Sequence, residues 1–157
     1  MNKEITELYG NRVRVRVSGI CWRDTRLLMV NHSLGNGDFW APPGGGIETG
    51  QTAQGALIRE FEEETGIIVE PGPFQFACEF IEPPLHAIEL FFNVSYQSGQ
   101  IKTGSDPEMG VQKQIIQEVK WMTFSELKEL RSENLHGIFK LCKEPQELMN
   151  LTGYWKI

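Results

Sequence analysis

The residues from Gly45 to Ile67 read GGIETGQTAQGALIREFEEETGI, a glycine-rich segment followed by apolar residues at helical spacing. Thr52 is a suitable helix N-cap, and Gly66 is a suitable residue to end the helix. We therefore predict a helix over about residues 52–64. The glycines and prolines between residues 31 and 51 predict a loop with at most a short strand around Phe39 and Trp40.

Three glutamates of the predicted helix share one face. Glu60, Glu63 and Glu64 are related by i,i+3 and i,i+4, whereas Glu62 projects elsewhere. Like charges at i,i+4 destabilise an isolated helix by roughly 0.2–0.5 kcal/mol per pair, and Arg59 can offset part of that repulsion. A divalent cation would offset the rest, and hard oxygen ligands favour Mg²⁺, Mn²⁺ or Ca²⁺ over zinc. A glutamate run alone is more often a solvated helix face, so the prediction depends on the spacing of the whole stretch.

The glycines ahead of the helix form the second half of the predicted site. Gly44, Gly45 and Gly46 let the backbone approach a metal or a phosphate closely, and their carbonyls or amides could bind either. An ordinary tight turn is the alternative interpretation. Mg²⁺ is typically held by a few carboxylates together with substrate phosphate, so this combination points to phosphate chemistry.

The spacing resembles the Nudix box, the signature G-x5-E-x7-R-E-U-x-E-E-x-G-U, in which U is a bulky apolar residue. The positions that match are Gly45, Arg59, Glu60, Phe61, Glu63, Glu64, Gly66 and Ile67. Phenylalanine at a U position is a mild variation, and Gln51 stands where the family has glutamate. The resemblance implies an α/β/α sandwich around a mixed β-sheet and metal-dependent hydrolysis of a diphosphate linkage. The substrate would be a nucleoside diphosphate linked to another group, such as an ADP-ribose-like compound, or a nucleoside triphosphate.

The same resemblance implies the roles of the site residues. The three glutamates would hold Mg²⁺ or Mn²⁺, with help from a backbone carbonyl near Gly44 or Gly45, and Arg59 would orient the carboxylates. Arg59 and Glu63 are also assigned to catalysis. Gly44 and Gly46 are assigned to substrate binding.

The identity of the general base is not given by the box. Gln51 cannot serve, because an amide does not take up a proton at ordinary pH. We expect the base to lie in a loop beyond the box, with Glu108 and Glu118 as candidates, and we prefer Glu118 because it lies just before Trp121. The alternative for either residue is an exposed surface glutamate. Glu48 is expected to pair with a nearby cation or to cap backbone amides.

Two functional interpretations follow from Gln51. Bound metals can activate water and neutralise phosphate charge, so the substitution need not abolish hydrolysis. The competing interpretation is a Nudix-fold nucleotide-binding module with weak or no hydrolysis. Phe39 and Trp40 are candidates for stacking on a base or a sugar, although core packing is the commoner role of such residues. Pro83 or Pro84, at a spacing seen in some ADP-ribose-hydrolysing relatives, is a weak pointer to that substrate.

The flanking sequence predicts the rest of the sheet. Residues 12–17 alternate arginine and valine, which predicts a half-buried strand with the valines inward, continuing through residues 18–22 and paired as a hairpin with 27–30. Arg12, Arg14 and Arg16 could bind a phosphate, but an exposed strand face is the interpretation we favour. Further strands are expected over residues 73–82, 87–96 and 118–122. A capping box at Thr123 opens a helix, and residues 134–149 are expected to be helical with a break at Pro145.

Length and composition set the remaining expectations. A chain of 157 residues predicts one domain over residues 1–157. The net charge of -6 argues against a nucleic-acid polymer as partner and leaves a small nucleotide substrate bound with a cation. Cys21, Cys78 and Cys142 suggest neither disulfides nor zinc, and no apolar run is long enough for a signal peptide or a membrane span. We expect a cytoplasmic protein without membrane contact, and many Nudix relatives are homodimers.

Overall fold

The computed structural model describes residues 3–33, 37–103 and 116–157. Eight strands in these ranges form one sheet in the order β3-β2-β1-β6-β5-β8, with β4 paired to β1 and β7 paired to β2. Strands β1 and β6 are parallel, as are β5 and β8, and the other pairs are antiparallel, so the sheet is mixed. The strands are β1 (Val13–Arg23), β2 (Arg26–Ser33), β3 (Asp38–Ala41), β4 (Gly44–Gly46), β5 (Ile68–Glu82), β6 (Leu85–Ser98), β7 (Ile116–Met122) and β8 (Gly153–Lys156).

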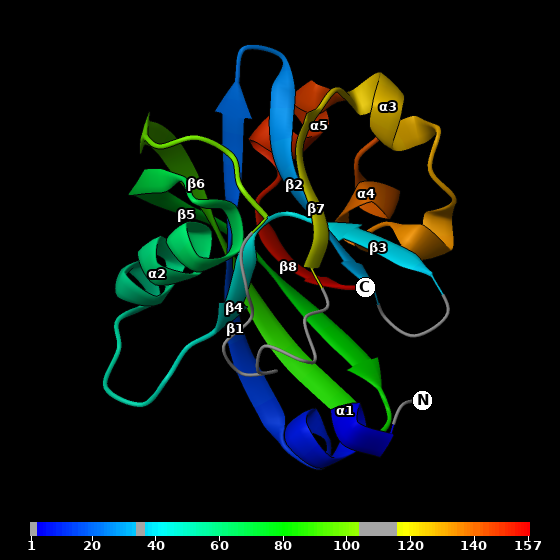
Figure 1. Ribbon diagram of the computed structural model, residues 1–157. Coiled ribbons are helices and arrows are strands. Elements are labelled where there is room, and N and C mark those ends of the chain that lie inside the picture. The colour runs from blue at the N-terminus through cyan, green and yellow to red at the C-terminus, as the bar shows by residue number, and fades with distance from the viewer. Residues whose placement is uncertain (1–2, 34–36, 104–115) are drawn as a thin grey trace.

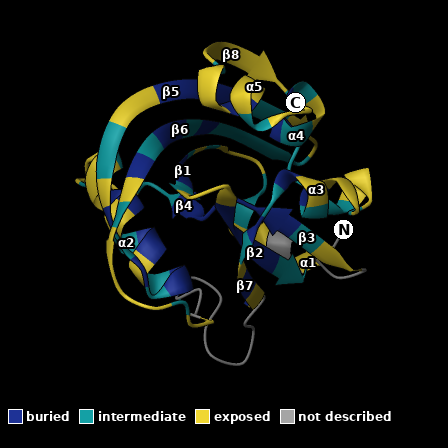
Figure 2. Ribbon diagram, turned by 90° about the horizontal axis from the view of Figure 1, so that it is seen from above, coloured by how far each residue is buried: buried dark blue, intermediate teal, exposed yellow. Residues whose placement is uncertain are grey.

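Helices lie on both sides of the sheet (Figure 1). The helices are α1 (Lys3–Tyr9), α2 (Ala53–Thr65), α3 (Phe124–Lys128), α4 (Ile138–Leu141) and α5 (Pro145–Asn150), with a 3-10 turn, η2, at Ser132–Asn134. Seen from above, β5 and β6 curve around β1, with α2 on one side of the molecule and α3, α4 and α5 on the other (Figure 2). The predicted α/β/α arrangement around a mixed sheet is confirmed.

Two apolar clusters correspond to the two sides. One joins α2, through Leu57 and Phe61, to Val17 of β1 and to Val30 of β2. The other joins Ile20 of β1 to residues of β3, β5, β6 and the C-terminal helices. Successive residues of a strand point to opposite faces, so β1 contributes to both clusters. The position of α2 is therefore fixed by its apolar contacts with one face of the sheet.

The predicted hairpin is confirmed. Strands β1 and β2 are antiparallel, with Arg23 opposite Arg26, so Asp24 and Thr25 form a two-residue turn. Asp24 has a φ of 55°, the left-handed conformation that such short turns require and that aspartate tolerates.

The burial predicted for the arginine and valine alternation is wrong in the first half of β1. Val13 and Val15 are 54% and 45% exposed, and only Val17 is fully buried. Arg14 and Arg16 are partly buried instead. The reason is that the apolar cluster under α2 includes β1 from Val17 onward, while the arginine face of the strand meets polar and aromatic side chains.

The segment after residue 122 is less helical than predicted. The capping box at Thr123 is present, but residues 132–150 form only short helices, because Pro145 begins α5 and the chain between α4 and α5 is irregular. Strand β8, which pairs with β5, and helix α1 were not predicted. The glycine segment also holds a short strand of its own, β4.

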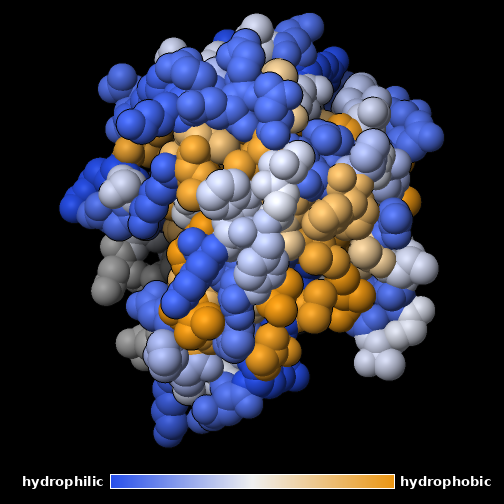
Figure 3. Space-filling model, turned by 180° about the vertical axis from the view of Figure 1, so that it is seen from behind, coloured by the Kyte–Doolittle hydropathy of each residue, from blue (hydrophilic) through white to orange (hydrophobic). Residues whose placement is uncertain are grey.

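The three cysteines are part of the two apolar clusters. Cys21, Cys78 and Cys142 are free and buried, and burial raises the pKa of Cys78 to about 12 and of the other two to about 11. None of the helices in the described ranges is long and apolar enough to span a membrane. Apolar residues nevertheless gather on one face of the surface (Figure 3), and exposed large apolar side chains include Phe74 of β5 with Tyr154 and Trp155 of β8.

Candidate functional site

Helix α2 is fixed at both ends by the predicted caps. Thr52 accepts a hydrogen bond from the backbone N–H of Gly55 at 3.0 Å, and Gly66 ends the helix with a φ of 74°. This helical phase turns two glutamates inward: Glu60 is 7% exposed and Glu64 is 4% exposed. Glu63 is partly exposed and Glu62 is exposed, so the predicted separation of Glu62 from the other three is confirmed.

The glycines of β4 lie directly against these buried carboxylates. Strand β4 pairs with β1, placing Gly46 opposite Arg16 and Gly45 opposite Val17. A Cβ atom on Gly45 would lie 2.2 Å from the carboxylate of Glu60. The backbone N–H of Gly44 donates a 3.0 Å hydrogen bond to Glu64. The absence of a side chain at residue 45 is thus what allows the helix carboxylate to reach the strand.

Arg59 gathers the polar groups on the helix. Its Nη1 lies 3.0 Å from Glu60 Oε1 and 3.0 Å from Glu63 Oε2, and its Nη2 donates to the carbonyl of Gly46 at 3.2 Å. Burial alone would lower the pKa of Arg59, but the charges of Glu60 and Glu63 outweigh it and raise this pKa. The arginine therefore offsets part of the repulsion between the carboxylates, as the sequence predicted.

Gln51 is part of the same arrangement. Its Oε1 accepts hydrogen bonds from Arg59 Nη2 and from the backbone N–H of Glu48, both at 3.2 Å. Glu48 is exposed and lies 3.9 Å from Arg59, which agrees with the expected pairing to a cation. The amide oxygen of Gln51 makes two contacts that a carboxylate oxygen could make equally well.

The donor set at α2 fits a hard divalent cation. Carboxylates from one helix face and the glycine backbone of β4 are oxygen donors of the kind that Mg²⁺ binds. The space that a Cβ on Gly45 would fill is also kept open beside Glu60. Among the residues that the structure describes, no three His, Cys, Asp or Glu side chains already converge on one point. Glu60 and Glu63 are instead drawn together by Arg59.

A second polar cluster lies next to this site, and the sequence analysis named only one of its members, Arg16, for which it favoured an exposed strand face. Arg16 Nε donates to Glu89 Oε2 at 3.0 Å, and Glu89 Oε1 lies 2.8 Å from His136 Nε2. Glu89 is only 8% exposed. Burial alone would raise its pKa, but His136 and Arg16 outweigh burial and lower the pKa of Glu89 to about 2. A lone glutamate between Ile88 and Leu90 in an apolar strand was the signal that could have identified it.

Histidine and aromatic side chains surround that cluster. Burial, followed by the positive charge of Arg16, lowers the pKa of His32 to about 4. The ring of His136 lies 6.3 Å from the ring of Phe39 and 5.6 Å from that of Phe91. Arg16, Glu89 and His136 are brought together from β1, β6 and the segment before α4, which are remote in the sequence.

The remaining predicted residues are distributed differently. Trp40 is 5% exposed within the apolar cluster on the α3 to α5 side, so it packs in the core, the role that the sequence favoured. Phe39 is partly exposed beside His136. Glu118 lies exposed on β7 opposite Asn31, and Glu108 lies outside the described residues.

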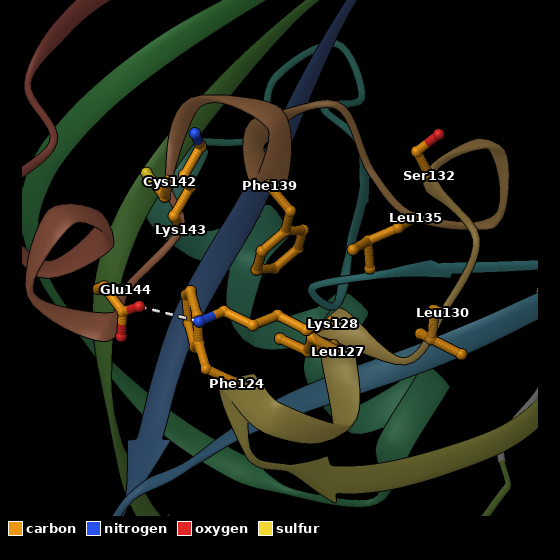
Figure 4. A pocket seen from close by; sticks show the side chains of 10 residues that line it. All are labelled: Phe124, Leu127, Lys128, Leu130, Ser132, Leu135, Phe139, Cys142, Lys143 and Glu144. Atoms are coloured by element: carbon orange, nitrogen blue, oxygen red, sulfur yellow. Dashed lines mark hydrogen bonds and ion pairs between the residues drawn. The ribbon is translucent and has the colours of Figure 1, made fainter.

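A separate hollow of about 430 Å³ lies between α3 and α4 (Figure 4). Phe124, Leu127 and Phe139 supply much of its apolar wall, and Lys128 Nζ pairs with Glu144 Oε1 at 2.8 Å at its rim. None of the residues predicted as functional lines this hollow. The predicted site residues of α2 and β4 lie outside this hollow.

Comparison with known sequences identifies related proteins. A family model described as "NUDIX domain" matches residues 11–141. An ADP-ribose pyrophosphatase of Methanocaldococcus jannaschii is 32% identical over 97 residues, covering 59% of this chain and 56% of that protein. The NAD-capped RNA hydrolase NudC of Deinococcus radiodurans is 28% identical over 107 residues, covering 68% of this chain and 35% of that protein. The chain thus matches about half or less of the length of these two relatives.

Comparison of structures gives the same fold. A NUDIX hydrolase from Nitrosomonas europaea superimposes with a TM-score of 0.74 at 18% identity, covering 90% of this chain and 93% of that chain. These values establish similarity of fold alone.

Proposed function

Because the chain belongs to the Nudix family, we propose that it is a metal-dependent pyrophosphohydrolase that cleaves a diphosphate linkage in a nucleotide. The observation that supports this most is the packing of β4 against α2, where Gly45 leaves room for Glu60 and Gly44 binds Glu64. Burying a charged side chain costs free energy, so the burial of Glu60 and Glu64 against the glycine backbone is not expected of an ordinary solvated helix face.

The proposed substrate is a nucleoside diphosphate linked to a further group, of the ADP-ribose kind, or a nucleoside triphosphate. The relatives support this range, because one is named for ADP-ribose, another for NAD-capped RNA, and a Proteus vulgaris relative, 29% identical over 98 residues, for 8-oxo-dGTP. Two of these relatives are named as a pyrophosphatase and a diphosphatase. A substrate of nucleotide size is proposed, without a membrane partner.

Mg²⁺ or Mn²⁺ is the proposed cofactor. Glu60, Glu63 and Glu64 would hold it, assisted by the backbone near Gly45. When bound, the metal would activate water and neutralise charge on the phosphate oxygens.

The protein's own residues prepare the site for that chemistry. Arg59 orients Glu60 and Glu63 through its two 3.0 Å contacts and is itself held by Gly46 and Gln51. The N–H of Gly44 fixes one oxygen of Glu64. Glu118 is the proposed general base, and Phe39 is proposed to contact the base or sugar of the substrate.

The proposed activity is tested with purified protein and a panel containing ADP-ribose, NAD and nucleoside triphosphates. We expect release of nucleoside monophosphate from at least one of them in the presence of Mg²⁺ or Mn²⁺, and its loss with excess EDTA. Unchanged turnover in EDTA would contradict the proposed metal dependence. A metal titration on the best substrate then defines which cation is preferred.

A nucleotide-binding module without efficient hydrolysis is the second candidate, and Gln51 is the observation that favours it. The amide cannot act as a base, although it preserves the contacts to Arg59 and Glu48. If the panel gave no turnover while nucleotides still bound, this second function would replace the first.

Homodimerisation is a further proposal about the same protein. Tyr154 and Trp155 are exposed on β8, a strand at one end of the sheet order. Sedimentation velocity would detect a dimer, and a concentration-independent monomer would contradict the proposal.

A further inference from the structure

Arg12, which precedes β1, and Arg14 and Arg16 within it have three different environments. Arg12 is exposed, and its Nη2 donates to the carbonyl of Leu8. Arg14 lies with its guanidinium 4.0 Å from the centre of the Tyr9 ring. Arg16 is the one whose side chain is only 28% exposed and paired with a buried carboxylate, Glu89. Although the three arginines alternate regularly in the sequence, Arg16 differs from Arg12 and Arg14 because it pairs with a buried carboxylate.

The side chain of Arg16 is bound to Glu89 through its Nε atom. Among the described residues, the hydrogen bond that its side chain makes runs from Nε to Glu89 Oε2 at 3.0 Å. A guanidinium has five N–H donors, and this contact uses the one on Nε, which leaves the Nη donors for another acceptor. The side chain of Arg16 is 28% exposed, so it is not sealed in the core.

Glu89 is in turn held by His136. Glu89 Oε1 lies 2.8 Å from His136 Nε2, and His136 is anchored by its own backbone N–H, which donates to the carbonyl of Trp40 at 2.9 Å. The N–H of Ile138 donates to Nδ1 of the His136 ring at 3.2 Å. With Nδ1 as acceptor, the ring proton belongs on Nε2, the nitrogen nearest Glu89. Arg16 is therefore hydrogen-bonded to Glu89, and Glu89 lies beside a His136 whose backbone and ring are both held.

Arg16 lies beside the glycine strand that packs against α2. Arg16 is the β1 partner of Gly46, whose carbonyl accepts from Arg59. Burial alone would lower the pKa of Arg16, but Glu89 raises it, with smaller contributions from Glu64 and Glu60. Gly46 therefore neighbours both arginines: its backbone pairs with that of Arg16 on β1, and its carbonyl accepts a hydrogen bond from the side chain of Arg59 on α2.

The two arginines differ in what they can still bind. Arg59 already contacts Glu60, Glu63, the Gly46 carbonyl and Gln51. A diphosphate brought to a site with several carboxylates needs positive charge beyond that of the metal. A guanidinium suits phosphate oxygens because its planar donors match their geometry.

We propose that Arg16 binds a phosphate oxygen of the substrate and that Glu89 and His136 are positioning residues that hold its guanidinium in place beside β4. This inference rests on the proposed function, since it supplies the diphosphate with a cationic contact outside the Nudix box. It also gives one arginine of the arginine and valine alternation, Arg16, a role in substrate binding.

The test compares Arg16→Gln with Arg12→Gln, which removes the same charge from an exposed position on the chain just before the same strand. Binding is measured by calorimetry with two non-hydrolysable probes in Mg²⁺, methylenediphosphonate and α,β-methylene-ADP. We expect Arg16→Gln to weaken both probes about 10- to 100-fold, the usual effect of losing a charge-assisted hydrogen bond. Arg12→Gln should stay within about twofold of wild type, on the order of 0.4 kcal/mol.

The two probes separate phosphate recognition from base or sugar recognition. If Arg16→Gln weakened α,β-methylene-ADP but left methylenediphosphonate unchanged, Arg16 would contact another part of the nucleotide and the proposal would be wrong. Unchanged binding of both probes would overturn it as well. Arg16→Lys guards against misfolding, because it keeps the charge, and we expect an affinity between those of wild type and Arg16→Gln.

Glu89→Gln tests the positioning role separately. The amide oxygen can still accept from Arg16 Nε, but the charge that holds the guanidinium is lost. We expect a smaller rise in the dissociation constant for methylenediphosphonate than Arg16→Gln gives, with an unchanged circular dichroism spectrum. An affinity equal to wild type would remove Glu89 from the proposal.

Failure of the proposed function is distinguishable from failure of this inference. If no substrate were hydrolysed but methylenediphosphonate bound in an Arg16-dependent manner, the phosphate contact would stand and the hydrolase proposal would fall. If substrates were hydrolysed while Arg16→Gln bound both probes normally, the hydrolase proposal would stand and Arg16 would have no phosphate role.

Discussion

Substitution of Gly45 by alanine should damage both the stability of the protein and its response to metal. The added Cβ would lie 2.2 Å from Cδ and Oε1 of Glu60, well inside ordinary van der Waals contact. Glu60 is buried against β4, so its carboxylate must move or the strand must separate from the helix. Either response disturbs the arrangement proposed to hold the cation.

The size of the effect follows from that contact. Overpacking a tightly packed site typically costs about 1–3 kcal/mol. For a domain of this length, each kcal/mol lowers the melting temperature by roughly 2–4 °C, so we expect a decrease of about 2–12 °C. The Mg²⁺ concentration needed for half-maximal turnover should rise in the same variant, because Glu60 is displaced.

The assay is thermal unfolding by circular dichroism without metal, followed by an Mg²⁺ titration of turnover. Gly55→Ala is the matched control, because Gly55 is exposed in the first turn of α2 and its added Cβ would meet only Thr52 Oγ1, at 3.1 Å. Alanine also has the higher helix propensity, so this control should melt within about 2 °C of wild type or above it. If Gly45→Ala matched wild type in both melting temperature and Mg²⁺ response, the proposed contact between β4 and the α2 carboxylates would be refuted.

Three further predictions concern Gln51, Glu118 and Glu89. Gln51→Glu should raise kcat or leave it unchanged, since a carboxylate oxygen can keep both contacts of Oε1, whereas a large loss in steady-state assays would reveal a specific role for the amide. Glu118→Gln should lower kcat by about 10²–10⁴-fold if Glu118 is the general base, and a drop below about tenfold would count against that role. The pKa of Glu89 is lowered to about 2 in the folded protein, so its stabilising charge is complete above pH 4.5 and is lost as the pH falls toward 2. Acid titrations followed by circular dichroism should therefore show a smaller loss of stability between pH 5 and pH 3 for Glu89→Gln than for wild type, and parallel curves would contradict this linkage.

Local signals in the sequence explain why α2 and the hairpin could be predicted. Thr52 and Gly66 mark the helix ends, and the phase of the glutamates follows from the helical period alone. The turn after Arg23 likewise depends on neighbouring residues. These features need no knowledge of distant contacts, and the structure confirms them.

Features that depend on tertiary packing were predicted poorly. The burial of β1 was wrong at Val13 and Val15 because it depends on where α2 packs on the sheet. Strand β8 pairs in parallel with β5, a contact between residues far apart in the sequence, and its residues are all exposed. No periodic burial pattern therefore marked it.

The residues of the candidate site likewise include some that local sequence signals predict and others that depend on tertiary packing. The α2 carboxylates could be found because they lie within one helix, and Arg59 because it precedes them by a few residues. The cluster of Arg16, Glu89 and His136 could not, because its members come from three separate segments and meet only in the folded chain.

The most direct test of the central claim is the Mg²⁺-dependent release of nucleoside monophosphate by Glu63→Gln and Glu62→Gln. The two glutamates are adjacent on α2, and each change removes the same charge, but Glu63 contacts Arg59 whereas Glu62 is exposed. We predict that Glu63→Gln lowers kcat/KM by at least about 10²-fold, as expected for loss of a ligand to the cation that would neutralise charge on the phosphate, while Glu62→Gln remains within about twofold of wild type. Equal activity of the two variants would contradict the claim that one face of α2 carries the hydrolytic site.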